Sequence, residues 1–161
     1  MKARFVGELD FAAQNPAKPH VWELAADFGF LRDDGLLIVA LAGGHTDGAS
    51  IPRFLWRIFG HPFMGTNRFW AIPHDAGYSG PSGYAIIIDL NAAQLPPDYA
   101  LDNWMEIGVE SLINSRNLSR KWWDQTLLMA MSAMGEGWFK RRAVYRAVRL
   151  FGWRSYRKNR R

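Results

Sequence analysis

Short runs of apolar residues in the N-terminal part of the chain predict β-strands. Val, Ile, Leu, Phe and Trp are frequent at residues 4–9, 21–27 and 35–41, and runs of this length are typical of strands rather than helices. The sequence DDG at 33–35 lies between the last two runs, and these residues tolerate the backbone angles of a tight turn. We therefore predict a short antiparallel sheet that contains a hairpin.

In the C-terminal half the spacing of the apolar residues changes to three and four. This period is typical of helices with one buried face. It predicts helices over residues 99–114, 118–134 and 137–151. Asn117 or Ser119 would cap the middle helix, because their side chains accept hydrogen bonds from the first turn.

The pattern between these two parts is less regular. Residues 42–53 contain three glycines and a proline, which predicts a loop. A short helix is expected over residues 53–59 and a second one from near Ile72, because Pro73 suits a first turn, where its missing N–H is not needed. Residues 85–90 are apolar and fit either a strand or a buried connection.

Composition supports a folded chain with a single core. The 161 residues are 48% hydrophobic and 22% charged, so enough apolar surface can be buried to offset chain entropy. We predict one α+β domain over residues 1–151, with the short N-terminal antiparallel sheet packed against a mainly helical C-terminal half. There is no cysteine, so a metal would have to be bound by oxygen or imidazole ligands.

The N-terminal residues do not resemble a secretion signal. Lys2 and Arg4 are followed by an apolar run that Glu8 and Asp10 interrupt, and no window approaches the roughly 18 apolar residues of a membrane span. We therefore expect synthesis in the cytoplasm and no transmembrane segment.

Charge is distributed unevenly along the chain. Residues 140–161 contain ten basic residues and no acidic one, whereas residues 1–139 contain ten basic and fifteen acidic residues. Apolar positions from Ala143 to Phe151 fall on one side of a helix. This helix and the basic tail at 152–161 fit three roles: contact with an anionic membrane, contact with nucleic acid, or packing on the domain with solvated arginines.

Candidate chemistry is concentrated at residues 74–78. His74 and Tyr78 are four residues apart and share one face of a helix, and Asp75 lies about 100° around the axis. An imidazole moves protons near neutral pH, and a carboxylate binds a hard cation or orients a base.

A second carboxylate lies on a later predicted helix. Asp124 stands near apolar residues, so packing would bury it, and a buried carboxylate needs a partner. The candidates are His74, His45 and Arg120. The alternative interpretation is structural: the pair His74-Asp75 as a satisfied polar contact, and the loop residues as a turn held by their own side chains.

Three blocks in this order resemble a known family. The blocks are HTDGASIPRFLW at 45–56, IPHDAGY at 72–78 and SRKWWDQTLLMAM at 119–131. They are similar to small proteins of bacteriophages and prophages that contain a domain of unknown function, and the resemblance spans residues 5–156. Family positions map onto Asp47, Ser50, Pro52, Arg53, His74, Asp75, Tyr78, Ser119, Arg120 and Asp124.

The chain departs from the family pattern at three places. His45 replaces an aromatic residue before the threonine, and Pro73 stands where the family has a hydrophobic residue. Residues 85–101 resemble an insertion. These departures concern where the helix that carries His74 begins. They do not change the set of polar residues that matches the family.

The order of the parts also resembles phospholipase A2 enzymes. This resemblance implies that His74 is the base, that Asp75 with oxygens of residues 43–48, including Gly48 and Asp47, binds calcium or another divalent metal, and that Asp124 orients His74. Calcium prefers oxygen ligands and would stabilise a developing oxyanion. Tyr78 would belong to the same site.

Two functions follow as expectations. The first is a phage-encoded, metal-assisted hydrolase of ester or amide bonds that acts at the host envelope with a His-Asp-Asp site. The second is a non-enzymatic virion or assembly component that contacts other phage proteins, in which His45, Gly48, Ser50, Pro52, Arg53 and Arg120 support the same polar cluster structurally. After synthesis in the host cytoplasm, association with the virion fits either function.

Overall fold

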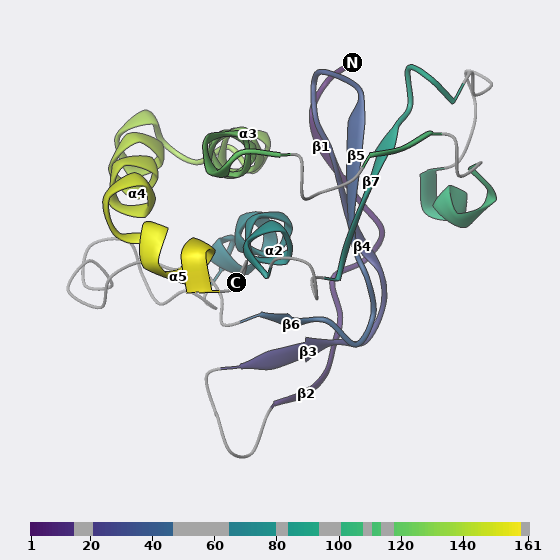
Figure 1. Cartoon of the computed structure of the whole chain (residues 1–161), viewed down its shortest axis with the longest axis horizontal. Coiled ribbons are helices and arrows are strands. Elements are labelled where there is room, and N and C mark those ends of the chain that lie inside the picture. The colour runs from purple at the N-terminus through teal and green to yellow at the C-terminus, as the bar shows by residue number, and fades with distance from the viewer. Residues whose placement is uncertain are drawn as a thin grey trace.

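An antiparallel sheet with helices on one face organises the protein (Figure 1). The structure is a computed structural model. It describes residues 1–14, 21–46, 65–79, 84–93, 101–107, 111–113 and 118–158.

The larger sheet has five strands in the order β1-β4-β5-β7-β8, and every neighbouring pair is antiparallel. Its strands are β1 (Arg4–Val6), β4 (Phe28–Leu31), β5 (Leu36–Ala40), β7 (Ala85–Asp89) and β8 (Leu112–Ile113). A smaller sheet, in the order β2-β3-β6, consists of β2 (Phe11–Gln14), β3 (Trp22–Leu24) and β6 (His45–Thr46). Strand β6 places Thr46 beside the first long helix.

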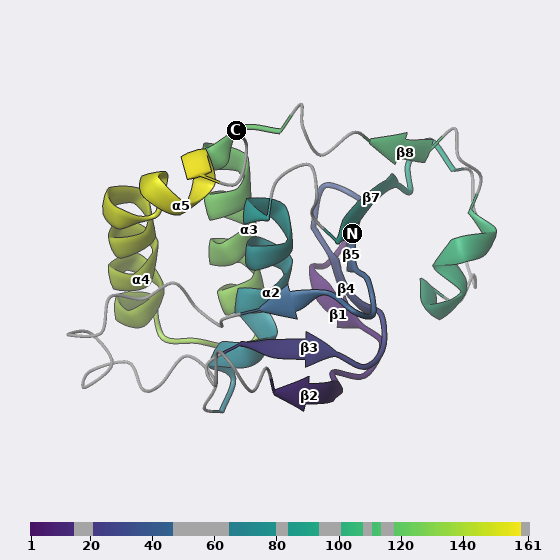
Figure 2. The ribbon, with the colours of Figure 1, turned by 60° about the horizontal axis from the view of Figure 1, so that its bottom comes forward.

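The helices stack outward from the sheet (Figure 2). Helices α2 (Asn67–Tyr78) and α3 (Arg120–Ala133) contact each other and the sheet, and α4 (Trp138–Phe151) packs on α3. The short helix α5 (Trp153–Lys158) follows directly. A 3-10 helix, η3 (Leu101–Glu106), lies on the opposite face of the sheet.

Alternation along the strands explains why the sheet is covered on both faces. Successive side chains of a strand point to opposite faces. Ile38 therefore joins the cluster that contains Trp70 and Trp123 of α2 and α3, while Leu37 and Val39 join the cluster next to η3. Both clusters are buried, and two-sided burial accounts for the uninterrupted apolar run of β5.

The observed architecture confirms the predicted α+β class. The turn at 33–35 closes a hairpin as predicted, and the two strands that it joins are β4 and β5. The run at 21–27 is not part of this hairpin. Within that run only Trp22–Leu24 forms a strand, β3. Residues 85–89 form a strand, which decides between the two alternatives that the sequence left open. Ser119 caps α3, since its side chain accepts a hydrogen bond from the N–H of Trp122.

The expected position of Pro73 at a helix start is wrong. Helix α2 begins at Asn67, so Pro73 is its seventh residue. An interior proline costs about 3 kcal/mol because it removes a backbone hydrogen bond. Trp70 and Ala71, which are completely buried in the turn before it, provide the packing that offsets this cost.

Two predictions in the C-terminal half also need correction. Residues 99–114 do not form one helix, because η3 contains a kink at Asn103 and Ile113 pairs with Ile87 at the edge of the sheet. Strand pairing has overridden the helical spacing there. Part of the basic tail at 152–161 forms helix α5, in which Tyr156 packs against Tyr78 with ring centroids 5.2 Å apart. The helix predicted at 53–59 lies outside the described residues.

Within the parts of the chain that the structure describes, no helix has the length and hydropathy of a membrane span.

Candidate functional site

Close packing of α2 against α3 builds the site. Gly77 lies against the ring of the buried Trp123, and a Cβ atom at residue 77 would come within 2.1 Å of that ring. Only glycine permits this approach. One turn earlier on α2, His74 then faces Asp124 of α3.

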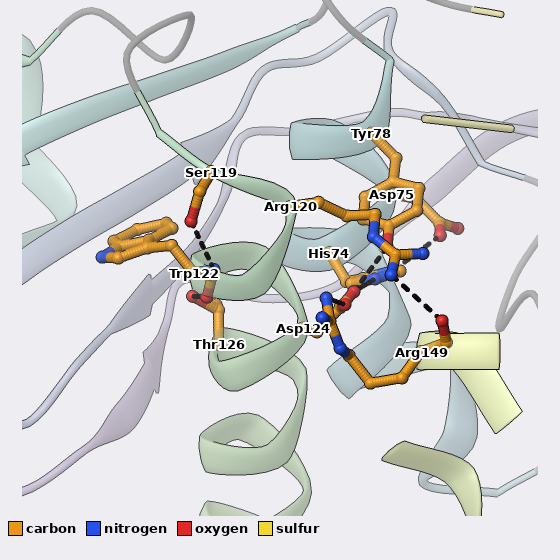
Figure 3. A network of polar contacts seen from close by, with 9 residues as sticks. All are labelled: His74, Asp75, Tyr78, Ser119, Arg120, Trp122, Asp124, Thr126 and Arg149. Atoms are coloured by element: carbon orange, nitrogen blue, oxygen red, sulfur yellow. Dashed lines mark hydrogen bonds and ion pairs between the residues drawn. The ribbon is translucent and has the colours of Figure 1, made fainter. Parts of the chain in front are cut away.

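The imidazole of His74 stands between two carboxylates (Figure 3). Its Nε2 lies 3.2 Å from Oδ1 of Asp124, and its Nδ1 lies 3.5 Å from Oδ1 of Asp75. The first distance is that of a hydrogen bond, whereas the second is at the outer limit. When His74 is neutral, donation from Nε2 to Asp124 leaves Nδ1 as the basic nitrogen, directed toward Asp75.

Asp124 has a hydrogen-bond donor on each oxygen. The hydroxyl of Tyr78 donates to Oδ1, which His74 also contacts, and Nη1 of Arg149 donates to Oδ2 over 2.8 Å. The side chain of Asp124 is 0% exposed. Because these partners lie on α2 and α4 while Asp124 itself belongs to α3, this carboxylate ties three helices together.

Asp75 is held from the smaller sheet. The hydroxyl of Thr46 in β6 donates to its Oδ2 over 2.6 Å. The backbone carbonyl of Asp75 accepts the N–H and the hydroxyl of Ser79. Asp75 therefore links the C-terminal end of α2 to strand β6.

The pKa values of His74 and Asp75 are both raised. Burial by itself would lower the pKa of His74, but the hydrogen bonds to Asp124 and Asp75 and their negative charges outweigh burial. For Asp75 burial is the dominant cause, and the contacts with His74 and Thr46 offset it only in part. The cluster thus favours a protonated His74.

Asp124 behaves differently from Asp75. Burial would raise its pKa, but hydrogen bonds from His74, Arg149 and Tyr78 lower the pKa below the ordinary value. Burial and the neighbouring Asp124 raise the pKa of Tyr78, so its phenol stays neutral and acts as a donor. Asp124 is therefore the carboxylate of the cluster whose ionised form is favoured.

Arg120 is not a partner of Asp124, although the sequence suggested it. Its Nη2 donates to the backbone carbonyl of Arg149 over 3.0 Å, and its buried Nη1 has no hydrogen-bond partner among the residues that the structure describes. His45, the other candidate, is exposed and lies 3.8 Å from Glu23. Arg149 takes the role instead.

Two members of the cluster were missed at the level of sequence. Arg149 stood among ten basic residues near the C-terminus, and nothing in the sequence distinguishes it from its neighbours. Thr46 immediately precedes Asp47 in the block HTDGASIPRFLW. Its position beside a predicted site residue was the available signal in the sequence.

A shallow pocket borders the cluster. It has a volume of about 380 Å³. Its lining includes His45, next to Thr46, and Ser79, which is bonded to Asp75. The remaining lining residues are Leu41, Ala42, Gly43, Gly44 and Tyr84.

The described residues hold no cluster of metal-ligating side chains. They contain no group of three or more His, Asp or Glu side chains that could hold an ion. Calcium takes six to eight oxygen ligands, and the described cluster offers two carboxylates, Asp75 and Asp124, which are both hydrogen-bonded to protein groups. Asp47, Gly48, Ser50, Pro52 and Arg53, which were predicted to contribute to this region, lie outside the described residues.

The chain belongs to a family of proteins of unknown function, DUF1353, whose family model matches residues 22–148. It is also similar to the uncharacterized protein y4jT of Sinorhizobium fredii (strain NBRC 101917 / NGR234), with 40% identity over 55 residues. The matched part is 34% of this chain and only 16% of that protein. No solved structure matches the chain. The resemblance to a domain of unknown function is thereby confirmed, whereas the phage setting remains a prediction.

Proposed function

We propose that the protein is a hydrolase of ester or amide bonds in which His74 is the general base. The observation that carries the proposal is the position of the imidazole, whose Nε2 contacts the buried Asp124 while Nδ1 points toward Asp75. A base oriented by a buried carboxylate is the arrangement that hydrolytic enzymes use to activate water or a hydroxyl.

In this mechanism His74 works above its raised pKa, where the ring is neutral. It accepts a proton from a water molecule at Nδ1, and the water attacks the carbonyl carbon of the substrate. The proton makes the ring an imidazolium, which the ionised Asp124 stabilises across the 3.2 Å contact. Tyr78 and Arg149 keep Asp124 ionised and fixed. The bond between the carbonyl carbon and the leaving oxygen or nitrogen then breaks, and the imidazolium gives its proton to that leaving group.

No step is assigned to a metal ion, because Asp75 is the only predicted metal-binding carboxylate among the described residues, and one carboxylate does not complete the coordination of a divalent cation. Metal assistance at Asp75, with calcium as the preferred ion, is a separate part of the proposal. It is tested by calorimetric titration of calcium, zinc and magnesium into the wild type and Asp75→Asn. Heat in the wild type that disappears in Asp75→Asn supports a site there, and no heat in the wild type rejects it.

The resemblance to phage proteins supports the biological setting of the proposal. An ester or amide bond of the host envelope would be the substrate, and the protein would act during infection or lysis. Other phage proteins or an envelope component would be its partners.

A second candidate function is favoured by the closure of the cluster. The side chains of His74 and Asp124 are 2% and 0% exposed. Both carboxylate oxygens of Asp75 and both of Asp124 have polar partners. A cluster whose polar groups are all hydrogen-bonded can hold helices together without catalysing a reaction. In that case the protein is a non-enzymatic virion or assembly component.

The deciding experiment measures hydrolysis of nitrophenyl esters of increasing acyl length and of a nitroanilide by the wild type, His74→Gln and Asp124→Asn. Loss of a general base lowers turnover about 100-fold or more. Urea denaturation identifies variants that remain folded, and only these count. Turnover that falls in folded His74→Gln supports the hydrolase. Absence of turnover in the wild type, or unchanged turnover in His74→Gln, rejects it in favour of the structural role.

A further inference from the structure

Helix α4 exposes large apolar side chains and arginines on the same side. Trp138 and Leu150 are 65% and 67% exposed, and Arg142 and Arg146 are also exposed. At about 100° per residue these four positions fall within an arc of about 120°. The opposite side of α4 carries Val144, Ala147 and Val148, which are buried. This outer face, Trp138-Arg142-Arg146-Leu150, therefore remains available after the helix has packed.

Helix α4, which carries the outer face, lies on the side of α2 and α3 that is away from the large sheet (Figures 1 and 2). The stretch from residue 137 to residue 158 contains eight Lys and Arg and no Asp or Glu. Lys140 and Arg149 are bound to Glu136 and Asp124. The remaining positive charge of this stretch is not compensated by acidic residues of the same segment, and it attracts an anionic surface.

Helix α5 continues the same combination of side chains. Trp153 is 44% exposed, and the guanidinium of Arg157 lies 6.0 Å from the centre of its ring. Aromatic and arginine side chains thus follow one another from α4 into α5. Large amphipathic rings beside cationic groups are the side chains that proteins place at a membrane interface.

We propose that the outer face of α4 docks on an anionic lipid bilayer, with Trp138 and Leu150 in the interfacial region and Arg142 and Arg146 at the headgroups. A lipid surface accepts the apolar and the cationic groups together. Nucleic acid would leave Leu150 without a complementary surface, and a second copy of the chain would bring arginines against arginines. The inference does not depend on the hydrolase.

Co-sedimentation with vesicles tests the docking. Phosphatidylcholine vesicles are compared with vesicles that contain about one third phosphatidylglycerol, whose anionic headgroups attract Lys and Arg. The wild type is expected to bind the anionic vesicles and not the neutral ones. Arg142→Gln/Arg146→Gln should lower partitioning about 30-fold. Trp138→Ala/Leu150→Ala should lower it about tenfold.

Matched controls carry equal changes elsewhere. Lys2→Gln/Arg4→Gln removes the same charge from the sheet side, and Met105→Ala/Leu112→Ala removes exposed apolar side chains there. Both controls should bind like the wild type. The proposal is overturned if the controls lose binding equally, if neutral vesicles bind as well, or if the wild type binds DNA or self-associates but does not bind vesicles.

Discussion

The missing side chain of Gly77 and the indole of Trp123 are complementary: a Cβ atom at residue 77 would come within 2.1 Å of that ring. Trp123 is completely buried and cannot yield without moving α3. Gly77→Ala should therefore lower the free energy of unfolding by about 2 to 3 kcal/mol, measured by urea denaturation. Gly137→Ala is the control, since its Cβ meets no atom, and it should cost at most about 1 kcal/mol. Equal losses for the two variants would contradict the packing argument.

His74 should make stability fall as pH rises. Its folded pKa is raised above the ordinary value of 6.5, so the protonated ring stabilises the fold below about pH 6.5 and this contribution is lost as pH rises through the folded pKa. One proton gives a slope of at most about 1.4 kcal/mol per pH unit. Urea denaturation across this range should show the slope in the wild type.

His74→Gln is the matched variant for the pH experiment. The fall in stability above about pH 6.5 should be smaller in this variant, because glutamine does not titrate. Asp75, whose pKa is also raised by burial, contributes a separate fall that begins at lower pH. If stability falls with the same slope in the wild type and in His74→Gln above about pH 6.5, His74 is not the titrating group.

Asp124 and Arg149 should be energetically coupled. Asp124→Asn removes the charge that His74 and Arg149 contact over 3.2 and 2.8 Å, and breaking a buried pair typically costs about 3 to 5 kcal/mol. In a double-mutant cycle with Arg149→Gln, the double variant should lose about 0.5 to 3 kcal/mol less than the sum of the single losses. Additive losses would mean that the observed ion pair has no energetic role.

Arg32 should resist replacement even by lysine. Its guanidinium binds both oxygens of Asp34, donates to the hydroxyl of Thr126 over 2.5 Å and lies 4.1 Å from the ring centre of Trp122. Lysine lacks the planar group that makes these contacts together. Arg32→Lys should cost about 2 kcal/mol in urea denaturation. The exposed Arg4→Lys should change stability by less than about 0.5 kcal/mol, and equal effects would refute this interpretation.

The sequence pattern predicted the caps, turns and helices whose formation depends on residues close together in the chain. The cap at Ser119, the turn at 33–35 and the helices α3 and α4 follow from short-range hydrogen bonding and from the apolar period. The errors fall where distant contacts decide. Residues 112–113 form a strand because β7 offers an edge, and Pro73 lies inside a helix because Trp70 is buried beside it.

The amino-acid sequence by itself determined the α+β class and selected His74, Asp75, Tyr78 and Asp124, because residue type and helical spacing are local properties. Only the tertiary structure decided which groups complete the cluster. Thr46 and Arg149 reach the two aspartates from elements far away in the chain. Their hydrogen bonds form because α2, α3, α4 and β6 pack together, and a one-dimensional pattern does not encode which exposed arginine will be turned inward.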